Sequence, residues 1–198
     1  MSPTPSTQPP VASRVSRPRM PDSEKMILLP LSIRLKAFDK FLTPAVREQL
    51  HTEFAAYLDQ PQYPVVIGNR LVDQVCNTSL TDYSPQEARQ LLGRCYIERY
   101  QESVLGRLLL APISSNQDFE WVMRGLPRNY SAVTNYGTYW VAEVAPRHWR
   151  FDFEDDPGDP DFIMGTLLAG SEILRIPGYR VSYITLAHQH LSFEQTWG

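Results

Sequence analysis

Residues 84–111 read SPQEARQLLGRCYIERYQESVLGRLLLA, and this stretch decides the fold. Ser84, with Glu87 three residues later, has the pattern of a capping box at the start of a helix. Apolar residues then recur at helical spacing to the end of the stretch and spread widely around the axis, so we expect a long central helix covered on more than one side. Gly93 and Gly106 interrupt it, each at a cost of about 1 kcal/mol relative to alanine, which indicates close approach of neighbouring backbone.

Shorter helical patterns precede this stretch. Apolar residues at spacings of three and four predict helices over 32–42, 44–58 and 65–75. Thr43 followed by Pro44 is typical of an N-cap and first helical residue. We therefore expect the N-terminal half of the chain to form a helical layer.

Strand patterns dominate the part of the chain after the central helix. A short helix is expected from about residue 115, ended by Gly125 and Pro127. Aromatic and β-branched residues over 130–153 then predict an antiparallel hairpin, and 179–183 and 191–193 predict two further strands. Between these pairs of strands, Asp159 and Pro160 predict the start of one more helix. The expected class is α+β, with an N-terminal helical layer and a long central helix packed on a small, mostly antiparallel sheet with one helical insertion.

Length and composition fit a single globular domain. The chain has 198 residues, of which 42% are hydrophobic and 21% are charged. No apolar run reaches the 18 residues that a membrane-spanning helix needs. Residues 1–25 hold six of the 17 prolines and few large apolar side chains, so we expect a disordered arm rich in Pro, Ser and Arg there, followed by one domain over 26–198.

Charge is distributed unevenly along the chain. The first 21 residues carry +3 and the remainder −6, although the formal net charge is only −3. A negative body does not suit nucleic acid, whose backbone requires a basic stripe. The only cysteines, Cys76 and Cys95, lie in helical patterns, so we interpret them as reduced core thiols. With no apolar signal segment at the N-terminus, we expect a cytoplasmic location.

The central helix and the segment after it resemble an uncharacterised paralogous family of about 200 residues, a domain of unknown function expanded in myxobacteria. The residues that carry the resemblance are Leu92-Gly93-Arg94, Tyr100, Glu102-Ser103, Gly106-Arg107, Pro127-Arg128-Asn129-Tyr130 and Asn135-Tyr136. It covers residues 26–198. The chain departs from the family pattern at Arg99, where the family tends to have glycine, and at Ser103, where it tends to have threonine.

That family is in turn similar to a wider class of helix-plus-sheet domains. The class includes haem-nitric-oxide sensors, vinyl-reductase-type small-molecule-binding domains and vesicle-tether subunits with a lipid pocket. The resemblance implies a domain that encloses a ligand between helices and sheet. Haem sensors of this class use a helical histidine and a tyrosine-serine-arginine clamp. The clamp motif is absent here and the lone helical His51 favours a packed or surface role, so no cofactor is expected.

The candidate site residues follow from the resemblance and from the aromatic content. If helices and sheet enclose an apolar pocket, the expected walls are Tyr96, Tyr100, Tyr136, Trp140 and Trp149. Each of the resemblance-bearing arginines, Arg94, Arg107 and Arg128, bridges carboxylates and carbonyls within the fold or receives an anionic ligand group. We prefer the structural role for these arginines.

One alternative site lies near the C-terminus. His188, His190, Ser192 and Glu194 alternate, so a single strand would place them on one face, as a metal site requires. The opposite face carries Leu191 and Phe193, so the polar set also fits the solvated face of an edge strand. Zinc needs three or four ligands, and no other cluster supplies the rest. We therefore prefer the interpretation that these residues bind no metal.

The sequence contains no nucleophile elbow, dinucleotide fingerprint or cysteine with an orienting histidine nearby. We therefore expect a non-catalytic cytoplasmic sensory or adaptor domain that binds a small apolar ligand or a protein partner, including a second copy of itself. The alternative from another class is a small metal-dependent enzyme that uses His188, His190 and Glu194.

Overall fold

Helices dominate the first part of the chain and strands the last part. The computed structural model describes residues 11–103, 106–107 and 119–198. The helices are α1 (Leu31–Phe38), α2 (Pro44–Glu53), α3 (Ala55–Leu58), α4 (Val65–Ser79), α5 (Pro85–Glu102), α7 (Phe119–Ala132) and α8 (Pro160–Ile173), with 3-10 turns η1 (Asp22–Glu24) and η2 (Asp39–Phe41). The strands are β1 (Val11–Ser16), β2 (Met26–Ile27), β3 (Tyr63–Pro64), β4 (Thr138–Ala145), β5 (His148–Glu154), β6 (Arg180–Ala187) and β7 (His190–Thr196).

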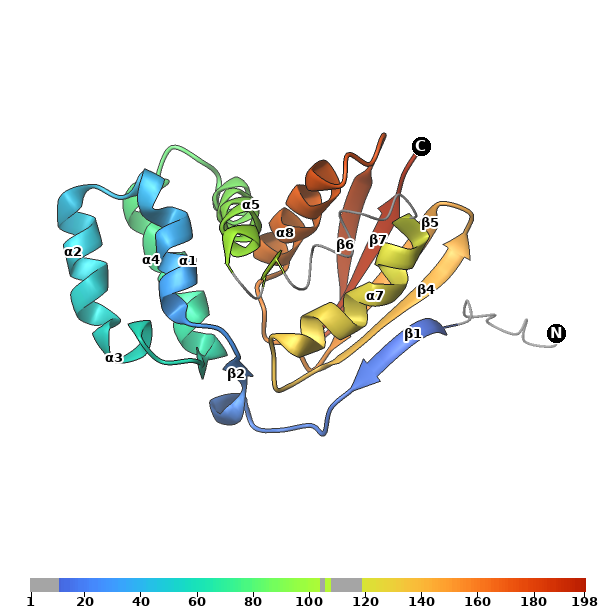
Figure 1. Cartoon of the computed structure of the whole chain (residues 1–198), viewed down its shortest axis with the longest axis horizontal. Coiled ribbons are helices and arrows are strands. Elements are labelled where there is room, and N and C mark those ends of the chain that lie inside the picture. The colour runs from blue at the N-terminus through green and yellow to red at the C-terminus, as the bar shows by residue number, and fades with distance from the viewer. Residues whose placement is uncertain (1–10, 104–105, 108–118) are drawn as a thin grey trace.

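The elements form a helical layer beside a sheet that carries two helices on one face (Figure 1). The five-stranded sheet is antiparallel, in the order β1-β4-β5-β7-β6. Helix α7 crosses β1 and β4, α8 packs near β6, and α5 lies along α8. Helices α1 to α4 gather on the other side of α5. The predicted α+β class is confirmed, with α5 between its two parts.

Helix α5 begins as predicted and ends earlier. The Oγ of Ser84 accepts from the Glu87 amide at 3.3 Å, and the Glu87 carboxylate accepts from the Ser84 amide at 3.0 Å, so the capping box is confirmed. The prediction that the helix runs to about residue 111 is wrong. Ser103 is extended, and its hydroxyl donates to the Tyr100 carbonyl at 2.7 Å and accepts from the Gly106 amide at 2.9 Å. This local bonding replaces the helical ladder. Residues 108–111 lie outside the described residues.

Two glycines let α5 and α8 approach each other closely. A Cβ added to Gly93 would overlap the Phe162 carbonyl of α8, and one added to Gly165 would overlap the Gln90 carbonyl of α5. Backbone therefore contacts backbone from both sides of the crossing, which only glycine permits. Close approach at Gly93 is confirmed, whereas Gly106 lies beyond the end of α5 and faces the carbonyl of Tyr100 in its own chain segment.

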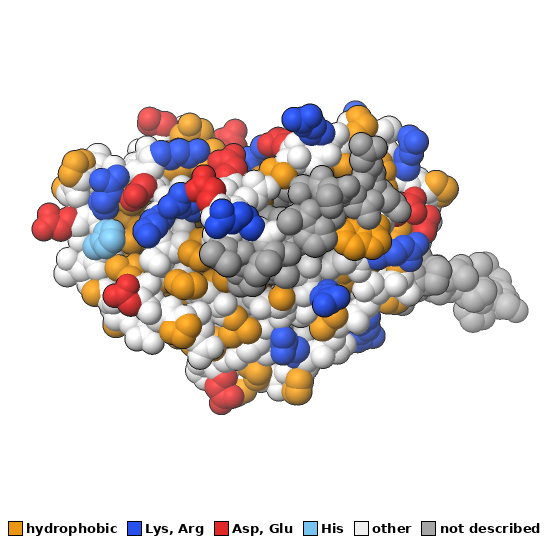
Figure 2. Space-filling view, viewed as in Figure 1, with side chains coloured by type: hydrophobic (Ala, Val, Ile, Leu, Met, Phe, Trp, Pro, Cys, Tyr) orange, Lys and Arg blue, Asp and Glu red, His pale blue; other side chains and the backbone are white. Residues whose placement is uncertain are grey.

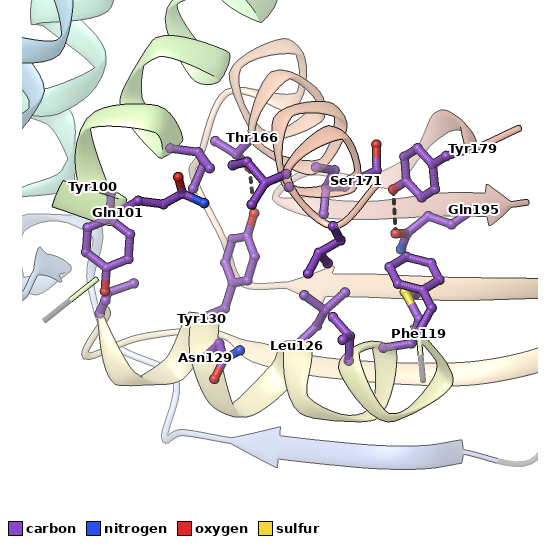
Figure 3. A pocket seen from close by; sticks show the side chains of 18 of the residues that line it. Tyr100, Gln101, Phe119, Leu126, Asn129, Tyr130, Thr166, Ser171, Tyr179 and Gln195 are labelled. Atoms are coloured by element: carbon purple, nitrogen blue, oxygen red, sulfur yellow. Dashed lines mark hydrogen bonds between the residues drawn. The ribbon is translucent and has the colours of Figure 1, made fainter. Parts of the chain in front are cut away.

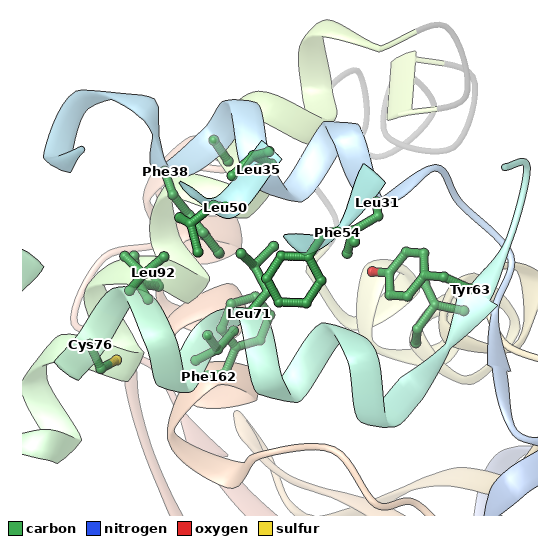
Figure 4. Packing of buried hydrophobic residues seen from close by; sticks show 14 of the residues in the cluster. Leu31, Leu35, Phe38, Leu50, Phe54, Tyr63, Leu71, Cys76, Leu92 and Phe162 are labelled. Atoms are coloured by element: carbon green, nitrogen blue, oxygen red, sulfur yellow. The ribbon is translucent and has the colours of Figure 1, made fainter. Parts of the chain in front are cut away.

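The crossing separates two hydrophobic clusters. The first joins α1 to α5 and contains large side chains such as Phe38, Phe54 and Leu92, together with Phe162 from α8 (Figure 4). The second lies between the sheet and helices α7 and α8, and its aromatic residues include Trp149, Phe151, Phe153 and Phe193. Each part of the fold thus has a core of its own, and α8 contributes to both.

The N-terminal segment belongs to the sheet, which corrects the prediction of a disordered arm over residues 1–25. Strand β1 pairs with β4, with Val15 opposite Tyr139, and Arg17 donates to the carbonyl of Ser131 at 2.7 Å. The composition of the segment does not predict this strand, because an edge strand is held mainly by backbone hydrogen bonds rather than by large apolar side chains. The predicted disorder of residues 1–10 lies outside the described residues.

Lys25 links the N-terminal segment to the residue that follows β5 and to the β6–β7 turn. Its side chain is fully buried, and its Nζ lies 2.8 Å from a carboxylate oxygen of Asp22, 2.8 Å from one of Asp155 and 2.7 Å from the Gln189 amide oxygen. Gln189 in turn donates to Asp22 at 2.8 Å. These hydrogen bonds lower the pKa of the Asp22 carboxyl. Three segments remote in sequence are joined at one ammonium group.

Helix α7 continues past the residues expected to end it. Gly125 and Pro127 lie inside the helix, which runs on to Ala132. Tyr130, near its C-terminal end, packs edge-on against Phe151 and Phe153 at centroid distances of 5.3 and 4.9 Å. Burial of this ring against the sheet offsets the low helix propensity of glycine and proline. The predicted start of the helix near residue 115 lies outside the described residues.

Two other expectations concern membrane-spanning helices and the two cysteines. Among the described residues, no helix is long and apolar enough to cross a bilayer. Cys76 and Cys95 are free and buried on different helices, and burial raises the pKa of both thiols. The interpretation of the two cysteines as core thiols is confirmed.

Replacing Gly93 by alanine tests the helix crossing. We expect Gly93→Ala to lower the free energy of unfolding by about 1–3 kcal/mol, because the added methyl group forces backbone apart. Gly125→Ala is the matched control, since its Cβ would meet nothing within 4 Å, and we expect it to raise stability by up to about 1 kcal/mol through helix propensity. Urea unfolding measures both values, and equal effects of the two substitutions would contradict the crossing.

Replacing Lys25 by methionine tests the buried ammonium group. We expect a loss of about 3 kcal/mol in the free energy of unfolding, because the partly buried carboxylate of Asp155 loses its nearer and only buried counter-charge and keeps the exposed Arg19 at 3.6 Å. The exposed Lys40→Met substitution is the control, and we expect it to change stability by less than about 0.5 kcal/mol. A loss no larger than that of the control would show that Lys25 does not hold the N-terminal segment in place.

Candidate functional site

A cavity of about 570 Å³ lies where α5, α7 and α8 meet in front of the sheet. This volume is within the range of about 300–1,000 Å³ typical of small-molecule sites. Its walls are mainly aliphatic and aromatic. The described lining residues are Ile97, Tyr100, Gln101, Arg107, Phe119, Val122, Met123, Leu126, Asn129, Tyr130, Val133, Thr166, Leu167, Gly170, Ser171, Ile173, Leu174, Tyr179 and Gln195.

The cavity is elongated and runs along α7 (Figure 3). Helices α7 and α8 run antiparallel here. The hydroxyl of Tyr130, near the end of α7, forms a hydrogen bond of 3.0 Å with Thr166 of α8. Phe119, at the start of α7, packs against Tyr179, which follows α8 in the chain, at a ring-centroid distance of 5.9 Å. Phe119 and Tyr130 are eleven residues apart on one helix, a distance of about 16 Å. Tyr100 lies at the Tyr130 end in the view of Figure 3, and Gln195 lies at the Phe119 end.

Most polar groups in the cavity wall are satisfied within the protein. The Tyr179 hydroxyl donates to the Gln195 amide oxygen at 2.7 Å. Thr166 and Ser171 each donate to a carbonyl one turn earlier in α8, both at 2.7 Å. Side-chain hydroxyls that bond their own helix present little polarity to the cavity. The wall is therefore apolar in effect, with exceptions at its two ends.

The cavity tyrosines are protonated at neutral pH. Burial raises the pKa of Tyr100 to about 12, and it raises the pKa of Tyr130 and of Tyr179 well above the ordinary range. Each hydroxyl is thus a neutral group that can donate one hydrogen bond. Arg107 is the cation among the described lining residues.

Of the five aromatic residues predicted to form pocket walls, Tyr100 lines the cavity. Tyr96 stacks behind it at 6.1 Å, against Phe162 and the buried Arg34. Tyr136 belongs to the helical cluster and Trp149 to the sheet cluster. The sequence identified aromatic residues near the cavity, but only one of its five side chains reaches it.

Trp140 lies on the other face of the sheet. It alternates along β4 with Tyr139 and Val141, whose side chains face the helices, so its own side chain points away from them. There it contacts Arg14, whose guanidinium lies 5.3 Å from the ring centre, and His190 at 5.7 Å. The predicted wall residue Trp140 therefore belongs to a different surface from the cavity.

The three arginines of the resemblance occupy three different settings. Arg94 forms an ion pair with Glu172 of α8 at 2.6 Å, next to the glycine crossing. Arg107 is exposed and lines the cavity. Arg128 is exposed on α7 outside the cavity. They do not form one site, and Arg107 alone is placed to meet a ligand.

The alternative metal site is not assembled. His188 lies in the β6–β7 turn rather than on a strand. His190 and Glu194 lie four residues apart on β7, or about 13 Å along the strand. Glu194 instead lies 2.5 Å from His148 on the neighbouring strand. Within the described ranges, no three His, Cys, Asp or Glu side chains gather as a metal site requires, so the prediction that this set acts together is wrong.

Haem does not fit the cavity. None of the chain's four histidines lines it: His51 lies in α2, His148 in β5 and His190 in β7, and His188 lies in the turn before β7. Neither cysteine lines it. Its tyrosines could bind iron only as phenolates, and burial raises the pKa of each of them. The described wall thus offers the thioether of Met123 but neither a histidine nor a cysteine thiolate as an axial ligand for haem iron.

Several cavity residues were not predicted from the sequence. Asn129 and Tyr130 lie in a motif of the family resemblance, and that position is a usable signal for a site. Tyr179 carries no signal, because the predicted strand over 179–183 gives no indication of which face meets the helices. Gln195 carries none because it lies beyond the predicted strand over 191–193. The cavity depends on packing between three helices that are far apart in the sequence.

Solved structures of H-NOX proteins share this fold. The oxygen-binding H-NOX domain related to soluble guanylate cyclases superposes with a TM-score of 0.54 at 12% identity, over 84% of this chain and 92% of that one. A variant of the T. Tengcongensis H-NOX gives 0.54 at 12%, over 84% and 94%. A variant of the unliganded Fe(II) H-NOX protein from K. algicida gives 0.51 at 11%, over 84% and 96%.

The resemblance to a family of unknown function and the likeness to haem-nitric-oxide sensor domains are both confirmed. The likeness to H-NOX structures, at identities of 11–13%, establishes a common fold. No curated protein sequence matches the chain. A family model matches residues 32–198, so the chain belongs to the family described as Protein of unknown function (DUF2378).

Proposed function

We propose that the protein is a non-catalytic cytoplasmic sensory or adaptor domain that binds a small apolar organic molecule in the cavity between α5, α7 and α8. The observation that carries this proposal is the cavity itself, about 570 Å³ with a mainly aliphatic and aromatic wall. Apolar cavities of this size expose the protein to a loss of packing energy unless a ligand fills them. The H-NOX-like fold adds support, since one of the related structures is an oxygen complex.

The position of the cavity suits signal transfer. Helix α8 lines it with Thr166, Leu167 and Gly170, and on its other side meets α5 at the glycine crossing. Helix α5 then packs on α1 and α4. A ligand that changes the spacing of α7 and α8 would therefore shift the contact between the sheet and the helical layer, which is the differential interaction that a sensor requires.

The chemistry of the wall supports binding rather than catalysis. The described lining residues include no Asp, Glu, His, Lys or Cys. General acid–base catalysis uses groups that titrate near the working pH, whereas burial moves the pKa of each lining tyrosine further from neutrality. The same set of groups serves well to hold and orient an unreactive molecule.

The visible surface does not favour a nucleic-acid ligand, which requires a basic stripe. On the face shown in Figure 2, the described Lys and Arg side chains are interspersed with Asp and Glu. A protein partner, or a second copy of the chain, remains the second candidate. The exposed Ile184 and Leu186 favour it, because they lie on the edge strand β6.

A substitution that fills the cavity tests the proposal. Gly170 lines the cavity and a Cβ there would meet nothing within 4 Å, so leucine at this position projects into the empty space. We expect Gly170→Leu to weaken binding of the neutral apolar dye Nile red by about tenfold or more. The melting temperature should hold or rise, because leucine is the better helix former.

Gly125→Leu is the matched control, since Gly125 is also an uncrowded helical glycine but does not line the cavity. We expect this variant to bind Nile red as the native protein does, measured by fluorescence titration. Equal binding by all three proteins would place the dye elsewhere and overturn the proposal.

Haem addition tests the choice of ligand class. We expect titration of the purified protein with haem to give no Soret band of iron ligated by a protein side chain, because no histidine or cysteine lines the cavity. Absorbance spectroscopy measures the Soret band, and the Gly170→Leu variant, whose cavity is filled, serves as the reference. A stoichiometric Soret band that the variant loses would contradict the assignment of an apolar organic ligand.

A further inference from the structure

Two buried polar groups at the ends of the cavity lack a hydrogen-bond partner. The hydroxyl of Tyr100 and the Nε2 amide of Gln195 are both buried and unpaired. The two residues are 6% and 1% exposed, respectively, and both line the cavity. Leaving such a group unpaired costs about 1–3 kcal/mol, so native structures rarely keep one without a reason.

Both groups are hydrogen-bond donors on residues that line the cavity. The Gln195 amide oxygen accepts from the Tyr179 hydroxyl at 2.7 Å, which fixes the orientation of the amide and leaves its N–H groups available. Burial raises the pKa of Tyr100 to about 12, so its hydroxyl keeps its proton at pH 7. A ligand that satisfies both groups needs an oxygen acceptor at each end.

The surroundings distinguish the two ends. Arg107 and Gln101 line the cavity together with Tyr100. A wall that holds both a guanidinium and a hydroxyl donor favours a carboxylate, which accepts charge-assisted hydrogen bonds from such groups. Gln195 lies by contrast near the rings of Tyr179 and Phe119, where a neutral oxygen is less costly to bury than a charge.

The length and polarity of the cavity between its ends set the shape of the ligand. Phe119 and Tyr130 are about 16 Å apart along α7, and the wall between them is formed by apolar side chains such as Val122, Met123 and Leu126. A flexible aliphatic chain fits this elongated space better than a compact ring system does.

We infer that the cavity binds a long-chain carboxylic acid that carries a second, uncharged oxygen near its far end. The carboxylate contacts Tyr100 and Arg107, the chain lies between α7 and α8, and the hydroxyl or keto oxygen accepts from Gln195. This inference rests on the proposed function, because it specifies the ligand of the same cavity.

Calorimetric titrations at pH 7 with three ligands test it. The ligands are dodecanoic acid, its omega-hydroxy derivative and dodecanol. We expect the hydroxy acid to bind about fivefold more tightly than the plain acid, the effect of one additional neutral hydrogen bond. We expect the plain acid to bind about tenfold more tightly than the alcohol, because its hydrogen bonds are charge-assisted.

Variants assign each preference to its residue. Tyr100→Phe and Arg107→Gln should each reduce the preference for acid over alcohol. The preference for the hydroxy acid should disappear in the Tyr179→Phe/Gln195→Leu double variant. This variant removes both partners of the Tyr179–Gln195 hydrogen bond, so neither polar group is left buried without a partner. The single Tyr179→Phe variant keeps the amide donor and should retain that preference. Circular dichroism confirms that each variant is folded.

The outcomes separate this inference from the proposed function. Equal affinity for the three ligands in the native protein, with binding lost in Gly170→Leu, would overturn the inference and leave the cavity as a general apolar site. A water molecule that satisfies Gln195 would appear as equal affinity for the two acids, which would overturn the assignment of the second oxygen. If none of the ligands binds and Nile red binding is unchanged in Gly170→Leu, the proposed function itself fails.

Discussion

The contact on which the rest of the structure depends is the crossing of α5 and α8. Gly93 and Gly165 bring the two backbones together, because a side chain at either position would overlap a carbonyl of the other helix. Arg94 and Glu172 pair beside this crossing. With the helices so close, the helical cluster and the sheet cluster lie on opposite sides of one narrow seam. The cavity is lined by residues that follow Gly93 in α5 and Gly165 in α8, together with residues of α7.

The parts of the fold that depend on neighbours in sequence could be predicted. The caps at Thr43, Ser84 and Asp159 act within one turn, and each is present as expected. The alternation of aromatic residues over the β4–β5 hairpin was equally local. These features locate most helices and strands and establish the α+β class before any tertiary contact is considered.

The remaining features depend on partners distant in sequence. Nothing near Lys25 indicates that Asp155 and Gln189 surround it, so the N-terminal segment was predicted to be disordered. Composition also could not show that Tyr130 would hold α7 helical past Pro127. The cavity residues differ in the same way. Tyr100 can be predicted because it lies in a motif. Gln195 lines the cavity because the pairing of β7 with β5 turns its side chain toward the helices, which the local sequence does not indicate.

The cavity lies in a fold that the protein shares with H-NOX structures. One H-NOX domain with this fold was solved as an oxygen complex, while the described wall of the present cavity has phenols, side-chain amides and a guanidinium and no histidine or cysteine. A crystal structure of the protein with omega-hydroxydodecanoic acid is the most direct test. The account predicts one extended chain between α7 and α8, with its carboxylate bonded to Tyr100 and its hydroxyl bonded to Gln195. A cavity that contains only water, or that has collapsed onto itself, would contradict it.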